Sequence, residues 1–427
     1  MPTRKGALSW ALYDWANSAF ATTVMAGFFP IFFKDFWSQG TPATVSTFWL
    51  GVSVATASLL TSVMAPVLGA FADRGAARKR FLLAFVVFGV LMTTGLYAVE
   101  AGRWPLAAGL YTLASVGFYG ANVFYDSLIV SVSDEASVHI VSGRGYALGY
   151  LGGGLLFLLN VIMVQHPRAF GLSSPAGAVQ FSFLTVAIWW TVFSIPIFLR
   201  VDEPAGGERM SLLRAVREGF RQIISTFHEI RRLKSLLMFL LAYWLYIDGV
   251  DTIIAMAVDF GKAIGISTNE LVTALLMVQF VAFPFAYLLG HVGQKLGPKR
   301  VILACIGVYV GVTVLGAQMN LRPFNLLGFH VSKFYTLAFL VGTVQGGIQA
   351  LSRSFYSQLI PPDRAAEFYG FYNMLGKFAA IIGPILMGTV GRITGEPRAG
   401  IQSIALLFIV GGLLLWRCTE KPGLRRV

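Results

Sequence analysis

The chain has 427 residues, of which 56% are hydrophobic and 12% charged, with a mean hydropathy of +0.70 and a formal net charge of +13. Apolar runs long enough to cross a bilayer as a helix, about 20 residues, recur from end to end. This composition excludes a soluble multidomain protein and indicates a polytopic α-helical membrane protein.

Twelve membrane-spanning helices are predicted in chain order, joined mostly by short connections. They cover residues 8–36, 44–71, 79–99, 105–131, 144–164, 179–199, 236–260, 269–292, 300–319, 333–358, 368–393 and 400–417. The first apolar run follows Arg4 and Lys5, but it contains Asp14 and has no small-residue cleavage site. We therefore interpret it as a retained span and not as a signal peptide.

The placement of the basic residues predicts the topology. Of the 33 Lys and Arg residues, 23 lie in segments on the inside and 8 in segments on the outside if the N-terminus is cytoplasmic. The positive-inside rule then places both termini in the cytoplasm. Because the basic excess is explained by topology, no nucleic-acid partner is expected.

A hydrophilic stretch at 201–235 divides the chain into two six-span bundles, expected at residues 1–200 and 236–427. Apolar residues recur within it at spacings of three or four, from Leu212 through Val216 and Phe220 to Ile230, on an otherwise Arg-rich segment. This period predicts an amphipathic helix along the inner membrane surface, which tethers the two bundles. A partner-binding role for the same helix is the alternative.

The two halves of the sequence resemble each other. "YDWANS" in the first span matches "IDGVDT" in the seventh, which pairs Asp14 with Asp248 and Asn17 with Asp251. "GANVFYDS" in the fourth span matches "GIQALSRS" in the tenth and pairs Asp126 with Arg353. Two parallel six-span repeats are an architecture of alternating-access transporters.

The loops after the second and eighth spans, "GAFADRGAARKR" and "GHVGQKLGPKR", repeat the same pattern. Gly69, Asp73, Arg74 and the cluster that begins at Arg78 resemble the signature loop of the major facilitator superfamily, with one extra residue before the basic cluster. The second copy has Gly290 and carries Gln294 in place of the acid. The resemblance covers the whole chain and implies a twelve-span transporter.

The stretch "ALYDWANSAF" in the first span is similar to the signature of the vacuole-effluxer-like family, whose bacterial members were long grouped as unknown major facilitators. The fungal members of that family are associated with release of amino acids from the vacuole. The favoured small-molecule substrate is an amino acid or a short peptide, because such a solute carries both a cationic and an anionic group for the acids and the arginine described next.

Four spans carry ionisable residues that hydrocarbon disfavours by about 2.5–3.5 kcal/mol each. By the resemblance, spans 1, 4, 7 and 10 line the central cavity, and these four carry Asp14, Asp126, the pair Asp248 and Asp251, and Arg353. We assign the Asp pair to a cationic group of the substrate or to a coupling proton. Arg353 suits a carboxylate, because its guanidinium forms a planar fork.

Alternatives stay open for several of these residues. Asp126 and Arg353 could pair across the repeat and close the cytoplasmic side without touching substrate. Asp14, with Asn17 one turn away, could tie its helix to a neighbour. Lys377, in the eleventh span, could extend to the cytoplasmic edge or neutralise an acid of the cavity.

Aromatic residues near these charges are mostly expected to pack, with Tyr13, Trp244 and Tyr246 as candidates for lining the cavity; the last two could enclose a cation. The resemblance also implies a cytoplasmic gate made by Gly69, Asp73, Arg74, Arg78 and Gly290. In that gate Asp73 lies at the N-terminus of the eleventh span, where the helix dipole favours an anion.

Other chemistry is not indicated. The five His residues and the two Cys residues, Cys305 and Cys418, show no metal-ligand spacing, and no catalytic constellation or nucleotide-binding loop is evident. We expect a secondary transporter, not an enzyme, without cofactor or metal, monomeric, and in the bacterial cytoplasmic (inner) membrane or an organelle membrane. The alternatives are a membrane sensor or scaffold on the same fold, or a transporter of an amphiphile or an organic anion.

Overall fold

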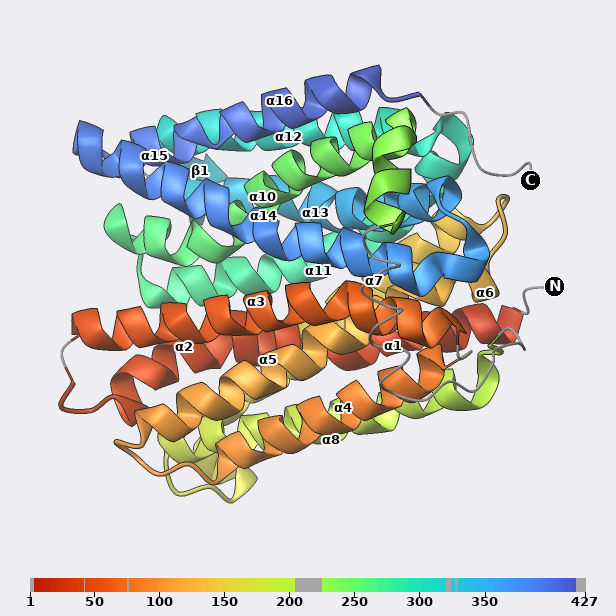
Figure 1. Cartoon of the computed structure of the whole chain (residues 1–427). Helices are drawn as coiled ribbons and strands as arrows, with labels where there is room; N and C mark the ends of the chain where they lie inside the picture. The colour runs from red at the N-terminus through yellow and green to blue at the C-terminus, as the bar shows by residue number, and fades with distance from the viewer. Residues whose placement is uncertain are drawn as a thin grey trace. The chain divides into compact units, whose positions relative to one another are not determined.

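The computed structural model describes residues 4–41, 43–74, 77–203, 225–319, 324–326 and 329–419. Long helices dominate it (Figure 1). Eleven helices within the described residues are long and apolar enough to cross a membrane, and the 30-residue α14 occupies the position of the eleventh expected span. The expected linker helix falls mainly on 204–224, outside the described residues; residues 225–232 are helical.

The long helices end close to the limits predicted from hydropathy. In chain order they are α1 (Arg4–Ala19), α3 (Ala43–Arg74), α4 (Arg78–Tyr97), α5 (Trp104–Ser127), α7 (Val138–Gln165), α8 (Pro175–Arg200), α10 (Lys234–Ala263), α11 (Thr268–Leu296), α12 (Pro298–Ala317), α13 (Lys333–Leu359), α14 (Ala365–Thr394) and α16 (Ala405–Arg417). The short helices are α2 (Phe29–Phe32), α6 (Ile129–Val132), η3 (Pro167–Phe170), η4 (Pro362–Arg364) and α15 (Pro397–Ser403).

The first span is not a uniform α-helix. After α1 it continues as the π-helical segment η1 (Phe20–Phe28), then α2, then the π-helical segment η2 (Phe33–Trp37). Phe29 N–H donates to the carbonyl of Val24, five residues back. Pro30 follows directly and has no N–H to donate, so the hydrogen-bond ladder is irregular at this point.

A short antiparallel hairpin was not expected from the sequence. Strands β1 (Phe324–Leu326) and β2 (Phe329–Val331) pair between α12 and α13, with Asn325 opposite His330. With three residues per strand, the pattern is too short for hydrophobic alternation to reveal it.

The chain forms two compact units. The first comprises Met1–Ser133, Leu148–Ile223 and Asp363–Met374, and the second comprises Asp134–Ala147, Ile224–Pro362 and Leu375–Val427. These units differ from the expected bundles at two helices. The N-terminal part of α7 belongs to the second unit, and the N-terminal part of α14 belongs to the first.

The helix packing inside the two units follows one scheme. In the first unit α1 packs against α8, α5 against α3 and α4, and α4 against α8 (Figure 1). In the second unit α10 packs against α16, α13 against α11 and α12, and α12 against α16. These are the same pairs of ordinal positions in each set of six spans, which is the packing that an internal repeat produces.

Membrane exposure follows the helical period. On α4 the side chains of Leu83, Val87 and Leu91 recur every four residues, and all three are exposed. Such an apolar outer face suits hydrocarbon, whereas Thr93 on the same helix is fully buried. This contrast directs attention to the polar groups that the spans bury.

Candidate functional site

Asp14 and Asn17 lie one turn apart on α1, and both contact α5. Tyr125 Oη donates to Asp14 Oδ2 at 2.7 Å, and Asn17 Nδ2 donates to Asn122 Oδ1, also at 2.7 Å. Both α1 side chains are buried. This pair therefore joins the first and fourth spans through two side-chain hydrogen bonds.

Aromatic rings hold the phenol that reaches Asp14. The ring of Trp10 stacks on that of Tyr125 with centroids 4.5 Å apart, and the ring of Tyr13 lies 4.7 Å from it. Trp10 Nε1 also donates to the Tyr125 carbonyl at 2.8 Å. The expected cavity residue Tyr13 is fully buried in this cluster, where it packs against its neighbours.

Asp126 follows Tyr125 on α5 and contacts the first part of α14. Asn373 Nδ2 donates to Asp126 Oδ2 at 3.2 Å and to the Tyr369 carbonyl at 3.0 Å. The Asp126 side chain is 8% exposed. Sequence reasoning did not single out Asn373, since an amide in an apolar helix carries no motif.

Asp248 on α10 is fully buried and is held by the backbone of α14. Gly383 N–H donates to Oδ1 at 2.9 Å and to Oδ2 at 3.0 Å, and Thr252 Oγ1 donates to Oδ1 at 3.3 Å. Pro384 lies directly after Gly383 inside the helix. Because proline has no N–H to donate, the hydrogen-bond ladder of α14 lacks one bond next to the carboxylate, although the helix continues from Ala365 to Thr394.

A glycine also faces the corresponding acid in the first half of the chain. Gly149 on α7 lies 234 residues before Gly383, just as Asp14 lies 234 residues before Asp248. A Cβ on Gly149 would lie 2.6 Å from Ser18 Oγ and 3.4 Å from Asp14 Cβ. The juxtaposition is thus repeated, but Tyr150 occupies the position of the proline, and Tyr125 Oη donates to Asp14.

The other candidate residues on α10 differ in burial and in their contacts. Asp251 is half-buried, one turn beyond Asp248. Tyr246 is fully buried and its Oη lies 2.6 Å from Ser352 Oγ on α13. Trp244 is half-buried, and its Nε1 has no hydrogen-bond partner among the described residues.

Arg353 on α13 is almost fully buried and is positioned by α7. Its Nε donates to Ser142 Oγ at 3.0 Å, and its Nη2 donates to the Ser142 carbonyl at 3.1 Å. The guanidinium carbon lies 4.3 Å from the ring centroid of Tyr146. Nearby, His139 Nδ1 lies 2.7 Å from Ser354 Oγ. The α7 partners were missed, because their side chains have no charge and no motif.

Two candidate side chains lie outside the described residues, those of Arg74 and Lys377. Their expected roles stay predictions. Within the part of the chain that the structure describes, no three His, Cys, Asp or Glu side chains gather in a way that could hold a metal ion.

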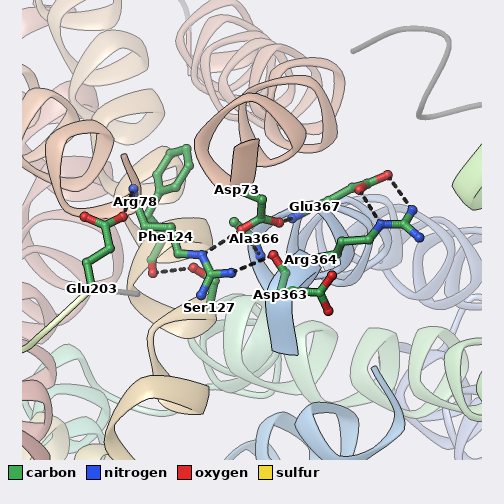
Figure 2. A network of polar contacts seen from close by, with 9 residues as sticks. All are labelled: Asp73, Arg78, Phe124, Ser127, Glu203, Asp363, Arg364, Ala366 and Glu367. Carbon is green, nitrogen blue, oxygen red and sulfur yellow. Dashed lines mark hydrogen bonds and ion pairs between the residues drawn. The ribbon is translucent and has the colours of Figure 1, made fainter. Parts of the chain in front are cut away.

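Asp73 caps the N-terminus of α14, as Figure 2 shows. Its Oδ1 accepts from Ala366 N–H at 3.1 Å, and its Oδ2 accepts from Glu367 N–H at 2.8 Å. These amides lie in the first turn of the helix, where donors have no intrahelical partner and the dipole favours an anion. The position is the one that the superfamily resemblance implies.

Arg78 joins this cap to the preceding loop (Figure 2). Its Nε donates to Asp73 Oδ1 at 2.7 Å, and its Nη2 donates to the Asp363 carbonyl at 3.3 Å. At the end of η4, directly before α14, Arg364 Nε and Nη2 contact the two carboxylate oxygens of Glu367 at 3.1 and 3.2 Å. The network is nearly dry, since the Asp73 and Arg78 side chains are 5% and 4% exposed.

The end of α8 contacts the same region. Arg78 N–H donates to Glu203 Oε1, and Lys79 Nζ donates to the Val201 carbonyl at 2.7 Å. Burial raises the pKa of Glu203, and its bonds from backbone amides partly offset that rise. The repeat extends to this contact, because Lys299 Nζ donates to the Cys418 carbonyl at 2.6 Å in the second unit.

Glycines bring the gate helices into backbone contact. A Cβ on Gly69 would lie 2.7 Å from the carbonyl carbon of Ala366, and one on Gly370 would lie 2.6 Å from Pro66 Cα. In the second unit, a Cβ on Gly290 would lie 2.9 Å from the His139 carbonyl oxygen. The second span with the eleventh, and the eighth with the fifth, thus make equivalent contacts.

Comparison with known proteins identifies this arrangement. The family model described as "Vacuole effluxer Atg22 like" matches residues 2–138 and 130–426. The uncharacterized MFS-type transporter YxiO of Bacillus subtilis (strain 168) is 37% identical over 409 residues, which cover 95% of this chain and 93% of that protein. Autophagy-related protein 22 of Coccidioides immitis (strain RS) is 26% identical and covers 96% of this chain and 86% of that protein.

The fold is also similar to solved structures. The crystal structure of the human organic anion transporter MFSD10 (TETRAN) superposes with a TM-score of 0.72 at 14% sequence identity, covering 97% of this chain and 100% of that chain. The family match and the similarity to YxiO identify a transporter of the major facilitator superfamily, not an enzyme, and the likeness to this solved structure shows the same fold. Within that superfamily, the chain belongs to the vacuole effluxer Atg22-like family.

Proposed function

We propose that this chain is a secondary active transporter that moves a small zwitterionic solute, an amino acid or a short peptide, by alternating access coupled to protons. The observation that carries the proposal is the charge on four helices. Asp14 and Asp126 are 8% exposed, Asp248 is fully buried, and Arg353 is 2% exposed. They lie on α1, α5, α10 and α13, the first and fourth spans of each half.

The signs of these charges favour a zwitterion. Burying an ionised group costs several kcal/mol, about 2.5–3.5 for each at mid-membrane, unless it is paired or has a functional use. Acids on α1, α5 and α10 suit an ammonium group, and the Arg353 guanidinium suits a carboxylate. An organic anion, the rival solute class, uses the guanidinium but leaves the acids without a role.

We assign different roles to the two acids on α10, proton exchange to Asp251 and positioning of α14 to Asp248. Two acids one turn apart repel unless one is protonated or a cation is near. Gly383 N–H donates to both oxygens of Asp248, so we assign Asp248 to positioning α14 against α10 at the turn before Pro384. The exchangeable proton is then assigned to Asp251, which is less buried.

Uptake into proteoliposomes tests the proposal. The purified full chain is reconstituted, and a panel of labelled amino acids and dipeptides is offered with an acidic exterior. We expect at least one to accumulate above its equilibrium level, and a protonophore to abolish the accumulation. If none of the panel accumulates or exchanges, while the protein is folded and correctly inserted, the proposed substrate class is wrong.

Substitution of the α10 acids tests the division of roles. We expect Asp251→Asn to abolish gradient-driven uptake and to spare solute exchange, because exchange needs no net proton movement. Asp248→Asn is the matched variant, and we expect it to keep most uptake, since its amide oxygen still accepts from Gly383 N–H. Initial rates of uptake and of counterflow measure both. The reverse pattern would reassign the proton to Asp248.

Exchange of Asp126 and Arg353 tests whether the pair acts only as a gate. We expect the double variant Asp126→Arg/Arg353→Asp to stay inactive, because the Ser142 bonds and the Tyr146 ring position a guanidinium at residue 353. Arg353→Lys is the companion variant and should raise KM more than it lowers kcat. Restoration of uptake by the exchange would show that the two charges only pair.

A further inference from the structure

A cation on α7 is not used by the transport site. Arg144 is half-buried and lies six residues into the helix, about 9 Å from its cytoplasmic end at 1.5 Å per residue. Among the described residues it contacts the ring of Tyr287, with the guanidinium carbon 5.9 Å from the centroid, and it forms no ion pair with a carboxylate. A charge at this depth requires a counter-ion.

The neighbouring face of α11 carries a polar stripe that ends in a second cation. Tyr287, His291 and Lys295 are spaced four residues apart and therefore share one face. The rings of Tyr287 and His291 lie 4.5 Å apart, and His291 Nδ1–H donates to the Tyr287 carbonyl at 2.9 Å. Lys295, in the last turn of α11, is exposed.

Close helix contact brings these groups together. A Cβ on Gly143, the residue before Arg144, would lie 3.0 Å from Gly290 Cα, the residue before His291. The stripe and Arg144 thus flank the tightest approach of α7 and α11. The positive-inside rule predicts that these ends of α7 and α11 face the cytoplasm, so we expect the cations at the depth of the inner-leaflet headgroups.

Apolar side chains flank the cations. Tyr287 is 43% exposed, Leu288 is 52% exposed and Leu296 is 57% exposed. The loop before α7 lies near this face, because Gln294 Nε2 on α11 donates to the Glu135 carbonyl at 3.0 Å. Among the described residues, neither Arg144 nor Lys295 forms an ion pair with a carboxylate. A ligand that binds both the cations and the apolar side chains needs a negative headgroup joined to a hydrocarbon chain.

We propose that Arg144, His291 and Lys295 form a binding site for the phosphate of an anionic phospholipid in the cytoplasmic leaflet, with the acyl chain along Tyr287 and Leu288. Basic pockets between spans on the cytoplasmic side are suited to such headgroups. The lipid bridges α7 and α11 at their glycine contact. The inference does not depend on the identity of the transported solute.

Thermal unfolding of the full chain in neutral detergent tests the site. We expect phosphatidylglycerol to raise the midpoint by about 2 °C or more, as ligand binding to the native state does. Phosphatidylcholine with the same acyl chains and inorganic phosphate should leave it unchanged. An equal shift with inorganic phosphate would show a soluble-anion site instead, and no shift with any lipid would overturn the proposal.

Variants assign the effect to these residues. We expect Arg144→Ala to weaken phosphatidylglycerol binding about tenfold, the loss of one charge-assisted contact, and Lys295→Ala to weaken it in the same direction. Arg103→Ala is the control, because Arg103 is 66% exposed and pairs with Glu100 outside this face. If Arg144→Ala does not fold, the Lys295→Ala variant decides. Unchanged lipid affinity in the variant that folds contradicts the site.

Discussion

The substitution Gly69→Ala reduces solute uptake by about tenfold or more, because overpacking costs about 1–3 kcal/mol and 1.4 kcal/mol is a factor of ten. The new methyl group would lie 2.7 Å from the carbonyl carbon of Ala366 and 3.0 Å from Glu367 N, and closer still to the Ala366 carbonyl oxygen. These are backbone atoms, which cannot rotate away. The α3 helix must move from the N-terminal turn of α14, and Asp73 then loses its two amide donors.

Gly51→Ala is the matched control on the same helix, since nothing lies within 4 Å of a Cβ at that position. We expect the control to keep wild-type uptake, measured as the initial rate in proteoliposomes at equal amounts of inserted protein. Ala366→Gly should not rescue Gly69→Ala, because the clash is with backbone. Equal uptake by Gly69→Ala and Gly51→Ala would show that the α3–α14 contact is not part of the transport cycle.

Gly383→Ala should have an effect of similar size at the contact of α14 with α10. A Cβ there would lie 2.8 Å from Asp248 Oδ1 and 2.9 Å from Thr252 Cβ, and closer still to Thr252 Oγ1. The short, β-branched threonine cannot withdraw, so α10 and α14 separate and the amide bond to Asp248 is lost. We expect both lower thermal stability and loss of uptake.

Two further variants test whether the effect comes from this contact between α10 and α14. Gly388→Ala lies on the same helix with nothing within 4 Å of its Cβ, and it should behave like wild type. Thr252→Ala removes the nearest obstructing atom, so the double variant Gly383→Ala/Thr252→Ala should recover much of the loss. Such non-additivity is the signature of two groups in contact. Strict additivity of the two single effects would contradict the proposed packing.

Span positions were predictable because hydrocarbon imposes one requirement on every residue of a span. Length and hydropathy therefore placed α4, α8 and α12 within a few residues of their observed ends. The irregular first span was not predicted, since the π-helical segments depend on hydrogen-bond registry around Pro30 and not on hydropathy.

The charged residues were found from the sequence, but their partners were not. An acid such as Asp248 stands out in an apolar run, whereas the backbone amide of Gly383 has no side-chain signal. The dipeptide Gly383–Pro384 in "IIGPIL" is the clue that could have indicated this site, because a proline inside a helix removes one bond of the backbone ladder. For Arg353, the partners Ser142 and Tyr146 carry no comparable signal.

The repeat also predicted equivalence where the structure shows divergence. Asp14 and Asp248 occupy corresponding positions, yet the first bonds to a tyrosine of α5 and the second to a backbone amide of α14. The constant sequence offset between the two halves indicates that a helix and its facing glycine occupy corresponding positions. It does not predict the donors that neighbouring helices supply, because single substitutions such as Tyr150 for proline change those donors locally.

Solute-driven proton movement tests directly whether solute transport is coupled to protons through Asp251. Proteoliposomes with a pH-sensitive dye inside are held at a uniform pH, and a member of the amino-acid and dipeptide panel is added outside. We expect acidification of the lumen with the wild-type chain and none with Asp251→Asn, although that variant still exchanges labelled solute. Solute entry without acidification in the wild type, or equal acidification in Asp251→Asn, would contradict proton coupling through Asp251.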